Sequence, residues 1–251
     1  MNDKMQSLKR DTTLPILQTL LNEAESRAKK WASQRHAIAV DEKSLGQFAT
    51  DADRDLENFI RERLTEAFPS SAIIGEEYGG ALSASQSGWA IDPIDGTTNF
   101  ILGLPIWGIS IGYLEQGQSK LGAIALPDLG LSLVAGEGEG LFVNQKPTKV
   151  TPPPNRVKSI SLGENDFESG AATDLRAEQF RSEGHSVVRY RCAVFSLAMS
   201  ALGRLSGYVE HGCGLWDIAA AEIICREAGL RVQTSSLAPG RYAIDARWPS
   251  I

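Results

Sequence analysis

Cysteine and histidine are scarce in this chain. Its 251 residues include three of each. An odd, low cysteine count argues against a disulfide framework and indicates a reducing, cytoplasmic setting. The three cysteines, Cys192, Cys213 and Cys225, form no Cys-x-x-Cys pair, and with so few histidines a zinc site is not expected. Any bound metal would therefore have to be held by oxygen ligands.

Long apolar runs and an excess of positive charge are missing as well. No apolar run reaches the roughly 18 residues that indicate a transmembrane helix, and residues 1–7 contain no apolar segment typical of a secretory signal. The net charge of −6 disfavours broad binding to nucleic acids or anionic membranes. A small phosphorylated substrate remains compatible, because a bound cation reverses the local field. We therefore expect a cytoplasmic protein with no membrane partner and no nucleic-acid partner.

The chain is long enough for one large domain or two small ones, and 42% hydrophobic residues can form a substantial core. The clearest break is Thr151-Pro-Pro-Pro154, where three successive prolines exclude regular structure. The sequence therefore predicts an N-terminal α+β subdomain over residues 1–150 and a C-terminal α/β subdomain over residues 151–251.

The N-terminal part begins with two predicted helices. Apolar residues recur at helical spacing over residues 13–35 and over Asp53–Phe68, and the polar stretch 40–47 is expected to be an irregular connection between them. Six short apolar runs with short turns then predict an antiparallel meander, over residues 72–75, 88–91, 107–114, 120–126, 131–135 and 141–143.

The C-terminal part alternates between the two kinds of pattern. Strands are predicted over residues 157–162, 186–190 and 207–210, and helices over 174–183, 192–205 and 217–228. The last helix is expected to end at Gly229. Alternation of this kind favours an α/β layer.

The run Trp89–Phe100 carries the strongest chemical signal. Asp92 and Asp95 stand three residues apart around Pro93, directly after an apolar run. Because proline has no N–H for a strand ladder, we expect the strand to stop here. Two close carboxylates need compensation, usually a hard divalent cation. The following Gly96-Thr97-Thr98 amides can bind an anion if they open a helix. A cation site beside an anion site suggests phosphate chemistry.

Three other acidic positions each allow two interpretations. Glu76-Glu77 follows an apolar run and is either a solvated loop pair or a source of metal ligands. Asp217 either stabilises a helix start or needs a cation partner, since the helix after it is largely apolar. Asp53 either caps a helix or polarises a hydroxyl group or water, and the cap is the favoured interpretation when the residue is considered alone. The residues themselves leave these alternatives open.

Three segments together resemble one family. Gly75-Glu-Glu77, Trp89–Phe100 and Leu215–Gly229, in this order, are similar to motifs of the inositol monophosphatase family, and the resemblance covers roughly residues 10–245. It implies a layered αβαβα sandwich with an antiparallel-rich N-terminal sheet and a smaller mixed C-terminal sheet, usually as a homodimer. It also implies Mg²⁺-dependent hydrolysis of a small phosphate monoester by water that the metal activates.

The resemblance also implies roles for individual residues. A first Mg²⁺ would be held by Glu76, Asp92 and the carbonyl of Ile94, a second by Asp92, Asp95 and Asp217, and a third, weaker one by Glu76 with waters. Gly96 and Thr97 would bind the phosphate through backbone N–H groups. Thr97, held by Asp53, would orient the attacking water, with Glu76 as the third catalytic residue. The substrate would meet Asp95, Ala193 and Glu210.

The substrate is less well defined by the sequence. Inositol 1-phosphate is the leading substrate by family frequency, and histidinol phosphate, fructose 1,6-bisphosphate and 3′-phosphoadenosine 5′-phosphate are alternatives. Glu210 favours a polyol, because a carboxylate accepts hydrogen bonds from hydroxyl groups. Arg191 stands where relatives commonly have glycine. It is either an exposed strand-end residue or a substrate contact that favours an extra phosphate or carboxylate.

A hypothesis of another class is a non-catalytic regulatory or RNA-associated member of the family. Loss of a metal ligand would favour it. The implied acidic set is complete, with Asp53, Glu76, Asp92, Asp95 and Asp217 all present, and the net negative charge weakens direct RNA binding. The enzyme is therefore the preferred interpretation.

Overall fold

The computed structural model describes residues 10–44, 47–83, 85–154 and 157–249. Residues 1–7, which were considered above as a possible secretory signal, lie outside these ranges. Within them, no helix has both the length and the apolar character needed to cross a membrane.

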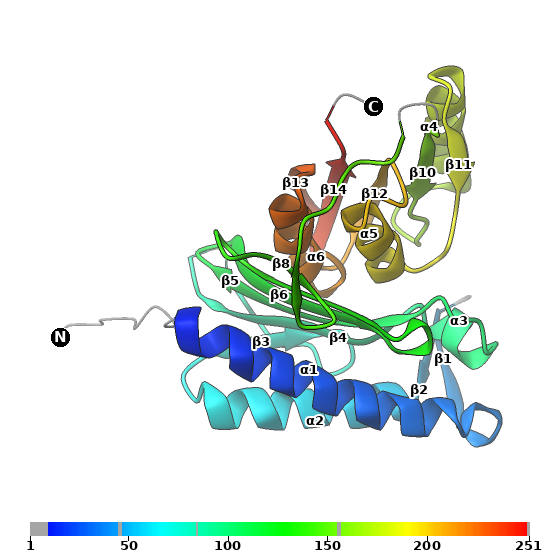
Figure 1. Ribbon diagram of the computed structural model, residues 1–251. Coiled ribbons are helices and arrows are strands. Elements are labelled where there is room, and N and C mark those ends of the chain that lie inside the picture. The colour runs from blue at the N-terminus through cyan, green and yellow to red at the C-terminus, as the bar shows by residue number, and fades with distance from the viewer. Residues whose placement is uncertain (1–9, 45–46, 84, 155–156, 250–251) are drawn as a thin grey trace.

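The elements stack in five layers (Figure 1). Helices α1 (Arg10–Ala32) and α2 (Asp51–Ala67) cover one face of a seven-stranded sheet, and α5 (Ala193–Ala201) and α6 (Leu215–Ala228) cover its other face. A five-stranded sheet packs on α5 and α6, and α4 (Gly170–Ser182) contacts two of its strands. The predicted αβαβα sandwich is confirmed.

In the seven-stranded sheet every neighbouring pair is antiparallel except β3 and β4, which are parallel. Its strands, in spatial order, are β3 (Ala72–Gly75), β4 (Gly88–Asp95), β5 (Gly108–Glu115), β6 (Gln118–Leu126), β7 (Leu131–Gly136), β8 (Gly140–Val143) and β9 (Lys146–Thr148). Short helical turns accompany it: η1 (Arg35–Ala37), α3 (Thr97–Ile101) and η2 (Pro127–Leu129).

The five-stranded sheet is mixed, as expected. In spatial order it contains β11 (Ser186–Val188), β10 (Ser159–Leu162), β12 (Gly207–Cys213), β14 (Arg241–Arg247) and β13 (Arg231–Ala238). Strand β10 pairs in parallel with β11 and β12, whereas β14 pairs antiparallel with β12 and β13. The sequence patterns predicted neither β13 and β14 nor the short β9.

Helix α6 lies unusually close to the first sheet because glycines face it. A Cβ atom on Gly112 of β5 would lie 2.5 Å from the backbone N of Ala220, and one on Gly122 of β6 would lie 2.2 Å from its carbonyl oxygen. Only glycine allows this approach. Side chains of α5 and α6 then form one buried cluster with residues of both sheets. This packing fixes the start of α6, and with it Asp217, beside the first sheet.

Strand β4 does not stop at Asp92, as the proline suggested. It continues to Asp95, and its register with β5 shifts between the pairs Asp92–Ser110 and Asp95–Gly108. Pro93 falls inside this irregularity, so its missing N–H removes no paired hydrogen bond from a regular ladder. The prediction of the strand end was therefore wrong, while both carboxylates still lie at the C-terminal end of β4.

The polar stretch 40–47 is not an irregular connection over its described residues. Val40–Ser44 forms β1, which pairs antiparallel with β2 (Gln47–Thr50); residues 45–46 lie outside the description. Alternation is weak in β1 because its residues 40–43 are all exposed, so its polar sequence hid the strand.

The proposed subdomain boundary falls between the sheets in sequence. Strand β9 ends at Thr148 and β10 begins at Ser159. The buried cluster around α5 and α6 nevertheless contains residues from both sheets. The division into residues 1–150 and 151–251 stays a prediction.

Candidate active site

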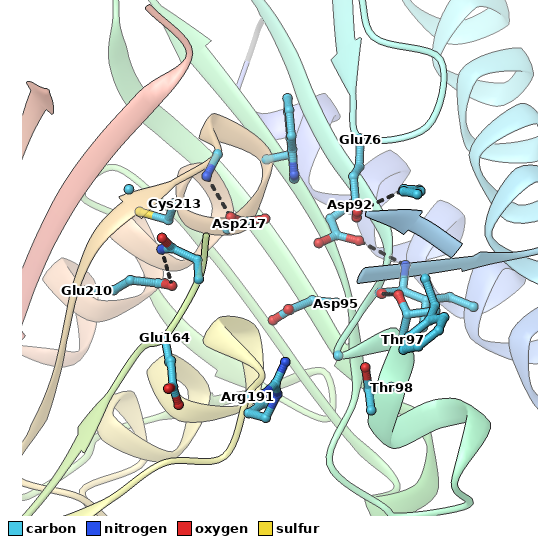
Figure 2. A pocket seen from close by; sticks show the side chains of 18 of the residues that line it. Glu76, Asp92, Asp95, Thr97, Thr98, Glu164, Arg191, Glu210, Cys213 and Asp217 are labelled. Atoms are coloured by element: carbon cyan, nitrogen blue, oxygen red, sulfur yellow. Dashed lines mark hydrogen bonds and ion pairs between the residues drawn. The ribbon is translucent and has the colours of Figure 1, made fainter. Parts of the chain in front are cut away.

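One pocket of about 390 Å³ gathers most of the predicted site residues (Figure 2). It lies where β4, α3, β12 and α6 meet. The predicted residues that line it are Glu76, Asp92, Ile94, Asp95, Gly96, Thr97, Arg191, Glu210 and Asp217. Asp53 is buried behind them, and Ala193 is 7% exposed and does not line the pocket.

Asp92 is the most buried carboxylate of the pocket, with 1% of its surface exposed. Its Oδ1 accepts a hydrogen bond from the backbone N of Ile94 at 3.0 Å, which turns the chain sharply after Pro93. Burial raises the pKa of Asp92 well above its usual range, and the neighbouring charges of Glu76 and Asp95 raise it further. A nearby cation would remove this penalty.

Asp95 ties β4 to the start of α5. Its Oδ2 accepts hydrogen bonds from the backbone N of Val194 at 2.5 Å and from the Cys192 thiol at 3.1 Å. Burial raises the pKa of Asp95 to about 7, although these two hydrogen bonds act in the opposite direction. The carboxylate is thus held in place while its charge stays poorly compensated.

Asp217 sits in the first turn of α6. Its Oδ2 accepts from the backbone N of Gly214 at 2.7 Å, the contact expected of a residue that stabilises a helix start. Burial, followed by the charges of Asp95 and Glu210, raises its pKa well above the usual range. Asp217 therefore stabilises the start of the helix and also belongs to the acidic cluster; its cation partner stays a prediction.

Glu76 follows β3 and faces a lysine that the sequence did not single out as a site residue. Lys43 of β1 places its Nζ 3.0 Å from Glu76 Oε1 and also bonds Glu77. The backbone here is fixed from below, because Glu57 of α2 accepts from the N of Glu77 at 2.7 Å. A Cβ on Gly75 would lie 2.2 Å from Glu57 Oε1, so a larger residue there would displace the Glu57 carboxylate from the amide of Glu77.

Asp53 connects the start of α2 to Thr97. Its Oδ2 accepts from the backbone N of Thr50 at 2.7 Å, which completes a capping box, and its Oδ1 lies 3.3 Å from Thr97 Oγ1. Thr97 Oγ1 is also 3.0 Å from the carbonyl oxygen of Ile94. Burial raises the pKa of Asp53 to about 7. Asp53 thus acts as a cap and also contacts the hydroxyl that the family resemblance places in catalysis.

Gly96 makes the tight turn between β4 and α3. Its φ of +83° lies in the left-handed region. A Cβ there would lie 2.9 Å from the carbonyl oxygen of Ile106 and 3.0 Å from Cys192 Cβ. The first amides of α3 have no partner within the helix, as at any helix start. The expectation that Gly96 and Thr97 open a helix is confirmed.

The acidic side chains suit a hard cation in their chemistry, although they do not close around one as they stand. Across the residues described here, no group of three or more histidine, cysteine or acidic side chains is arranged to hold a metal. Each carboxylate instead faces a protein donor: Lys43 for Glu76, and the backbone N atoms of Ile94, Val194 and Gly214 for Asp92, Asp95 and Asp217.

Two observations support the fit. The pKa values of Asp92, Asp95 and Asp217 are raised by burial and by one another's charge, so the cluster is short of positive charge. Its donors are carboxylates and a carbonyl, the ligands that Mg²⁺ prefers. Side-chain rotation is needed to bring them onto one ion.

Glu210 lies on the opposite side of the pocket from Glu76. It is 6% exposed, and it accepts hydrogen bonds from the Tyr208 hydroxyl at 2.6 Å and from Asn165 Nδ2 at 2.9 Å. Burial raises its pKa. The loop carrying Asn165 packs tightly here, since a Cβ on Gly163 would lie 2.3 Å from Glu210 Cδ.

Arg191 has an unusual backbone for an arginine, with a φ of +54°. Its side chain is exposed and lines the pocket, and Figure 2 shows it between Glu164 and Thr98. Within the described part of the chain its guanidinium has no hydrogen-bond or ion-pair partner. Arg191 is exposed, as the first alternative has it, but it stands in the turn before α5 and not at the end of β11, which is Val188; contact with a substrate stays a prediction.

Several residues of the site were not among the predicted ones. These are Lys43, Cys192, Glu164, Asn165 and Arg241, all of which line the pocket or contact a residue that does. Most lie in turns and loops, where no periodic pattern exists to place them. Gly163, directly after a predicted strand, was the one available sign of a close backbone approach.

Comparison with known proteins agrees with this architecture. The family model described as "Inositol monophosphatase family" matches residues 9–245. An inositol-1-monophosphatase of Mesorhizobium japonicum is 34% identical over 199 residues, which cover 76% of this chain and 74% of that protein. A histidinol-phosphatase of Mycobacterium tuberculosis is 33% identical over 193 residues, covering 73% and 72%.

A solved structure is similar over most of its length. The extragenic suppressor protein suhB of Bartonella henselae superposes with a TM-score of 0.82 at 25% sequence identity, covering 92% of this chain and 93% of that one. The layers seen in Figure 1 are therefore those of a known fold.

Proposed function

This chain belongs to the inositol monophosphatase family and is a phosphatase, a phosphoric monoester hydrolase, and we propose that its reaction depends on Mg²⁺ and acts on a small phosphorylated metabolite. One observation carries the proposal. Four acidic side chains, Glu76, Asp92, Asp95 and Asp217, converge on one pocket with raised pKa values for the three aspartates, beside the Thr97 hydroxyl.

The proposed ligands follow from the donors present. Glu76, Asp92 and the carbonyl of Ile94 would hold one Mg²⁺, and Asp92, Asp95 and Asp217 a second, with a third, weaker ion at Glu76. When bound, Mg²⁺ supplies neutralisation of the phosphate dianion and a lower pKa for water. The raised pKa values of the aspartates support this assignment, because a cation stabilises their ionised forms.

Thr97 is the proposed holder of the attacking water. Its single hydroxyl proton is donated either to the Ile94 carbonyl oxygen, 3.0 Å away, or to Asp53 Oδ1, 3.3 Å away. In both cases the lone pairs of the Thr97 hydroxyl oxygen can accept a hydrogen bond from water and fix its position. Glu76 is the proposed third catalytic residue, and its Oε1 accepts a hydrogen bond from Lys43 Nζ at 3.0 Å.

The substrate is proposed to lie between α3 and Glu210. The backbone N–H groups of Gly96 and Thr97 would bind phosphate oxygens, which suits the unpaired amides of a helix start. Asp95 and Glu210 would accept from substrate hydroxyl groups, and Ala193 would support that side from α5. Inositol 1-phosphate is the leading substrate.

Histidinol phosphate is supported almost equally, because the two relatives named for these substrates are similarly identical to this chain. Fructose 1,6-bisphosphate and 3′-phosphoadenosine 5′-phosphate complete the candidate set. We further propose a cytoplasmic homodimer without membrane or nucleic-acid partners. The cysteines Cys192, Cys213 and Cys225 are all free and buried, which suits a reducing compartment.

A phosphate-release assay tests the proposal. Purified protein is incubated with each candidate substrate in buffered Mg²⁺ and, in parallel, in chelator, with Asp92→Asn as the control for contaminating phosphatases. We expect Mg²⁺-dependent release that the variant lacks. Folded protein that releases phosphate from no phosphomonoester in Mg²⁺ would contradict the proposal. Light scattering of the same preparation tests the homodimer.

A further inference from the structure

Arg191 occupies a conformation that disfavours it. At φ +54° the Cβ of any residue other than glycine crowds the following carbonyl, and this conformation persists only where surrounding structure imposes it. Gly96, which packs against the neighbouring Cys192, adopts a left-handed conformation without this cost because it has no side chain. Arginine, with its long cationic side chain, occupies this strained position. The strain suggests that the side chain itself has a function.

The turn around Arg191 is held on both sides. The carbonyl oxygen of Tyr190 accepts a hydrogen bond from Asn99 Nδ2 at 2.8 Å, and the Tyr190 ring packs edge-on against Phe195 at 5.0 Å. On the other side, Cys192 caps α5 through Phe195 N and donates to Asp95. The backbone that carries Arg191 is therefore held in place beside the acidic cluster.

Neighbouring arginines are used differently. Arg189, two residues earlier, pairs with Asp174 at 2.6 Å and does not line the pocket. Arg241, which does line it, is bonded to Asp166 and to the carbonyl oxygen of Gly212, both at 2.9 Å. Over the ranges that the structure describes, the guanidinium of Arg191 has no such acceptor, although it lines the same cavity.

We propose that Arg191 determines specificity. The preferred substrate carries a second anionic group, a carboxylate or a phosphate, on the part that leaves as the alcohol, and Arg191 binds that group. This deepens the proposed phosphatase function and rests on it. Arginine is suited to the task, because its planar guanidinium binds either group through two parallel hydrogen bonds. The scissile phosphate lies at the acidic cluster and α3, so the second anion lies beyond Asp95.

Glu164 weakens the binding of a second anion. It lines the same pocket as Arg191, and within the described residues no ion pair joins the two side chains. Its charge opposes an incoming anion, so only a group placed directly on Arg191 gains from binding. Glu164→Gln is therefore expected to strengthen the preference for a second anion.

Matched substrate pairs test the proposal at fixed free Mg²⁺. 3-Phosphoglycerate against glycerol 3-phosphate isolates a carboxylate, and fructose 1,6-bisphosphate against fructose 1-phosphate isolates a phosphate. In the wild-type protein at least one pair should show kcat/KM about tenfold higher for the doubly anionic member, the effect of one charge-assisted contact. Arg191→Gly should reduce that ratio to about one, and Arg191→Lys should retain part of it.

Two controls separate recognition from folding. Arg189→Gln removes a neighbouring arginine outside the pocket and should leave the ratio unchanged. The melting temperature of Arg191→Gly should not fall, because relief of the left-handed strain offsets the greater freedom of glycine in the unfolded chain.

The outcomes are distinct. Wild-type protein that turns over both members of each pair equally, or an Arg191→Gly variant with an unchanged ratio, would overturn the role of Arg191 and leave the phosphatase proposal standing. An equal loss in Arg189→Gln would overturn it as well. Failure to turn over any phosphomonoester would instead overturn the proposed function from which the role of Arg191 is inferred.

Discussion

The two sides of the pocket are built in opposite ways. The carboxylate side, Glu76, Asp92, Asp95 and Asp217, lies at strand ends and a helix start, and its members are held mainly by backbone N–H groups while they repel one another. The substrate side, Glu164, Asn165, Arg191 and Glu210, lies mostly in loops. There, side chains bond one another, as Asn165 and Tyr208 do with Glu210.

The difference separates chemistry from recognition. Strand ends and a helix start fix the carboxylates in spite of the electrostatic repulsion between them. This side can therefore hold repelling groups close together for a cation. The substrate side satisfies its own buried polar groups and leaves Arg191 and Glu164 exposed to the ligand. Mutations on the first side should therefore remove turnover, and mutations on the second should change affinity and selectivity.

Asp95→Asn should have the largest effect on activity. Asparagine preserves the size of the side chain but carries no charge for a metal, so we expect kcat to fall on the order of 10³-fold or more. The fold should persist, since an amide oxygen still accepts from Val194 N. Steady-state kinetics with circular dichroism measures both. Turnover close to wild type would refute the metal role, and the exposed Asp41→Asn serves as the unaffected control.

The same substitution should stabilise the metal-free protein at neutral pH. The folded-state pKa of Asp95 is raised from 3.8 to about 7, so the folded protein holds the proton of this carboxyl more tightly than the unfolded chain does. This contribution to stability is fully present below pH 4 and is lost as pH rises to 7, where the buried side chain must ionise. The melting temperature of Asp95→Asn, measured in chelator, should match wild type near pH 4 and exceed it above pH 7. A difference that shrinks with rising pH would contradict this sign.

Thr97→Val should lower kcat by about 10²-fold, the usual range for a group that positions a proton transfer. Valine keeps the shape but loses the hydroxyl that lies between Asp53 and the Ile94 carbonyl. Thr97→Ser retains the hydroxyl and should recover most of the rate, with KM little changed in both variants. If serine and valine behave alike, the hydroxyl has no part in turnover.

The contrast also explains what the sequence could predict. Asp92, Asp95 and Asp217 sit at fixed offsets from apolar strand and helix patterns, so their convergence followed from those elements and from the Trp89–Phe100 and Leu215–Gly229 motifs. The layered fold was predicted from the family resemblance that these motifs carry. The short exposed strand β1 was not predicted, because neither of its faces is buried enough to impose an alternating pattern.

The substrate side could not be predicted to the same depth. Asn165 contacts Glu210 across 45 residues, and Lys43 reaches Glu76 across 33, pairings that no local pattern encodes. Arg191 was noticed only because glycine is common at its position in relatives. Its left-handed backbone and unpaired guanidinium became visible with the turn that Asn99 and Cys192 hold.

Cys192 joins the two sides and should give an intermediate effect. Its thiol donates to Asp95 and its sulfur caps α5, directly after Arg191. Cys192→Ala removes the donor and should lower kcat about threefold to tenfold, at a cost in stability of about 1 kcal/mol for the lost cap. Cys192→Ser should restore both, because a hydroxyl fills the same roles. Kinetics and thermal melts of the two variants test this prediction. If Cys192→Ala and Cys192→Ser have the same kcat, Cys192 has no positioning role.

Glu168→Gln should give the smallest effect and be confined to the substrate side. Glu168 bonds both terminal nitrogens of Arg176, at 2.8 and 2.9 Å, and lies 3.0 Å from His211 Nδ1, which anchors the loop that carries Glu164. The variant should raise KM about twofold to fivefold with kcat unchanged, and cost about 1 kcal/mol of unfolding free energy.

The pH dependence of this cost gives its signature. Hydrogen bonds from Arg176 lower the pKa of Glu168, so its stabilisation is present above the ordinary value of 4.5 and is lost as pH falls through the lower folded value. The difference in unfolding free energy between wild type and Glu168→Gln should therefore be constant near neutrality and vanish in acid. At neutral pH its sign is opposite to that of Asp95→Asn, because Glu168→Gln is less stable than wild type and Asp95→Asn is more stable. Glu178→Gln, whose pair with Arg181 is exposed and 3.5 Å long, should show neither change. A Glu168→Gln variant that lowers kcat instead of raising KM would show that the loop contributes to the reaction itself, and the separation between the two sides of the pocket would fail.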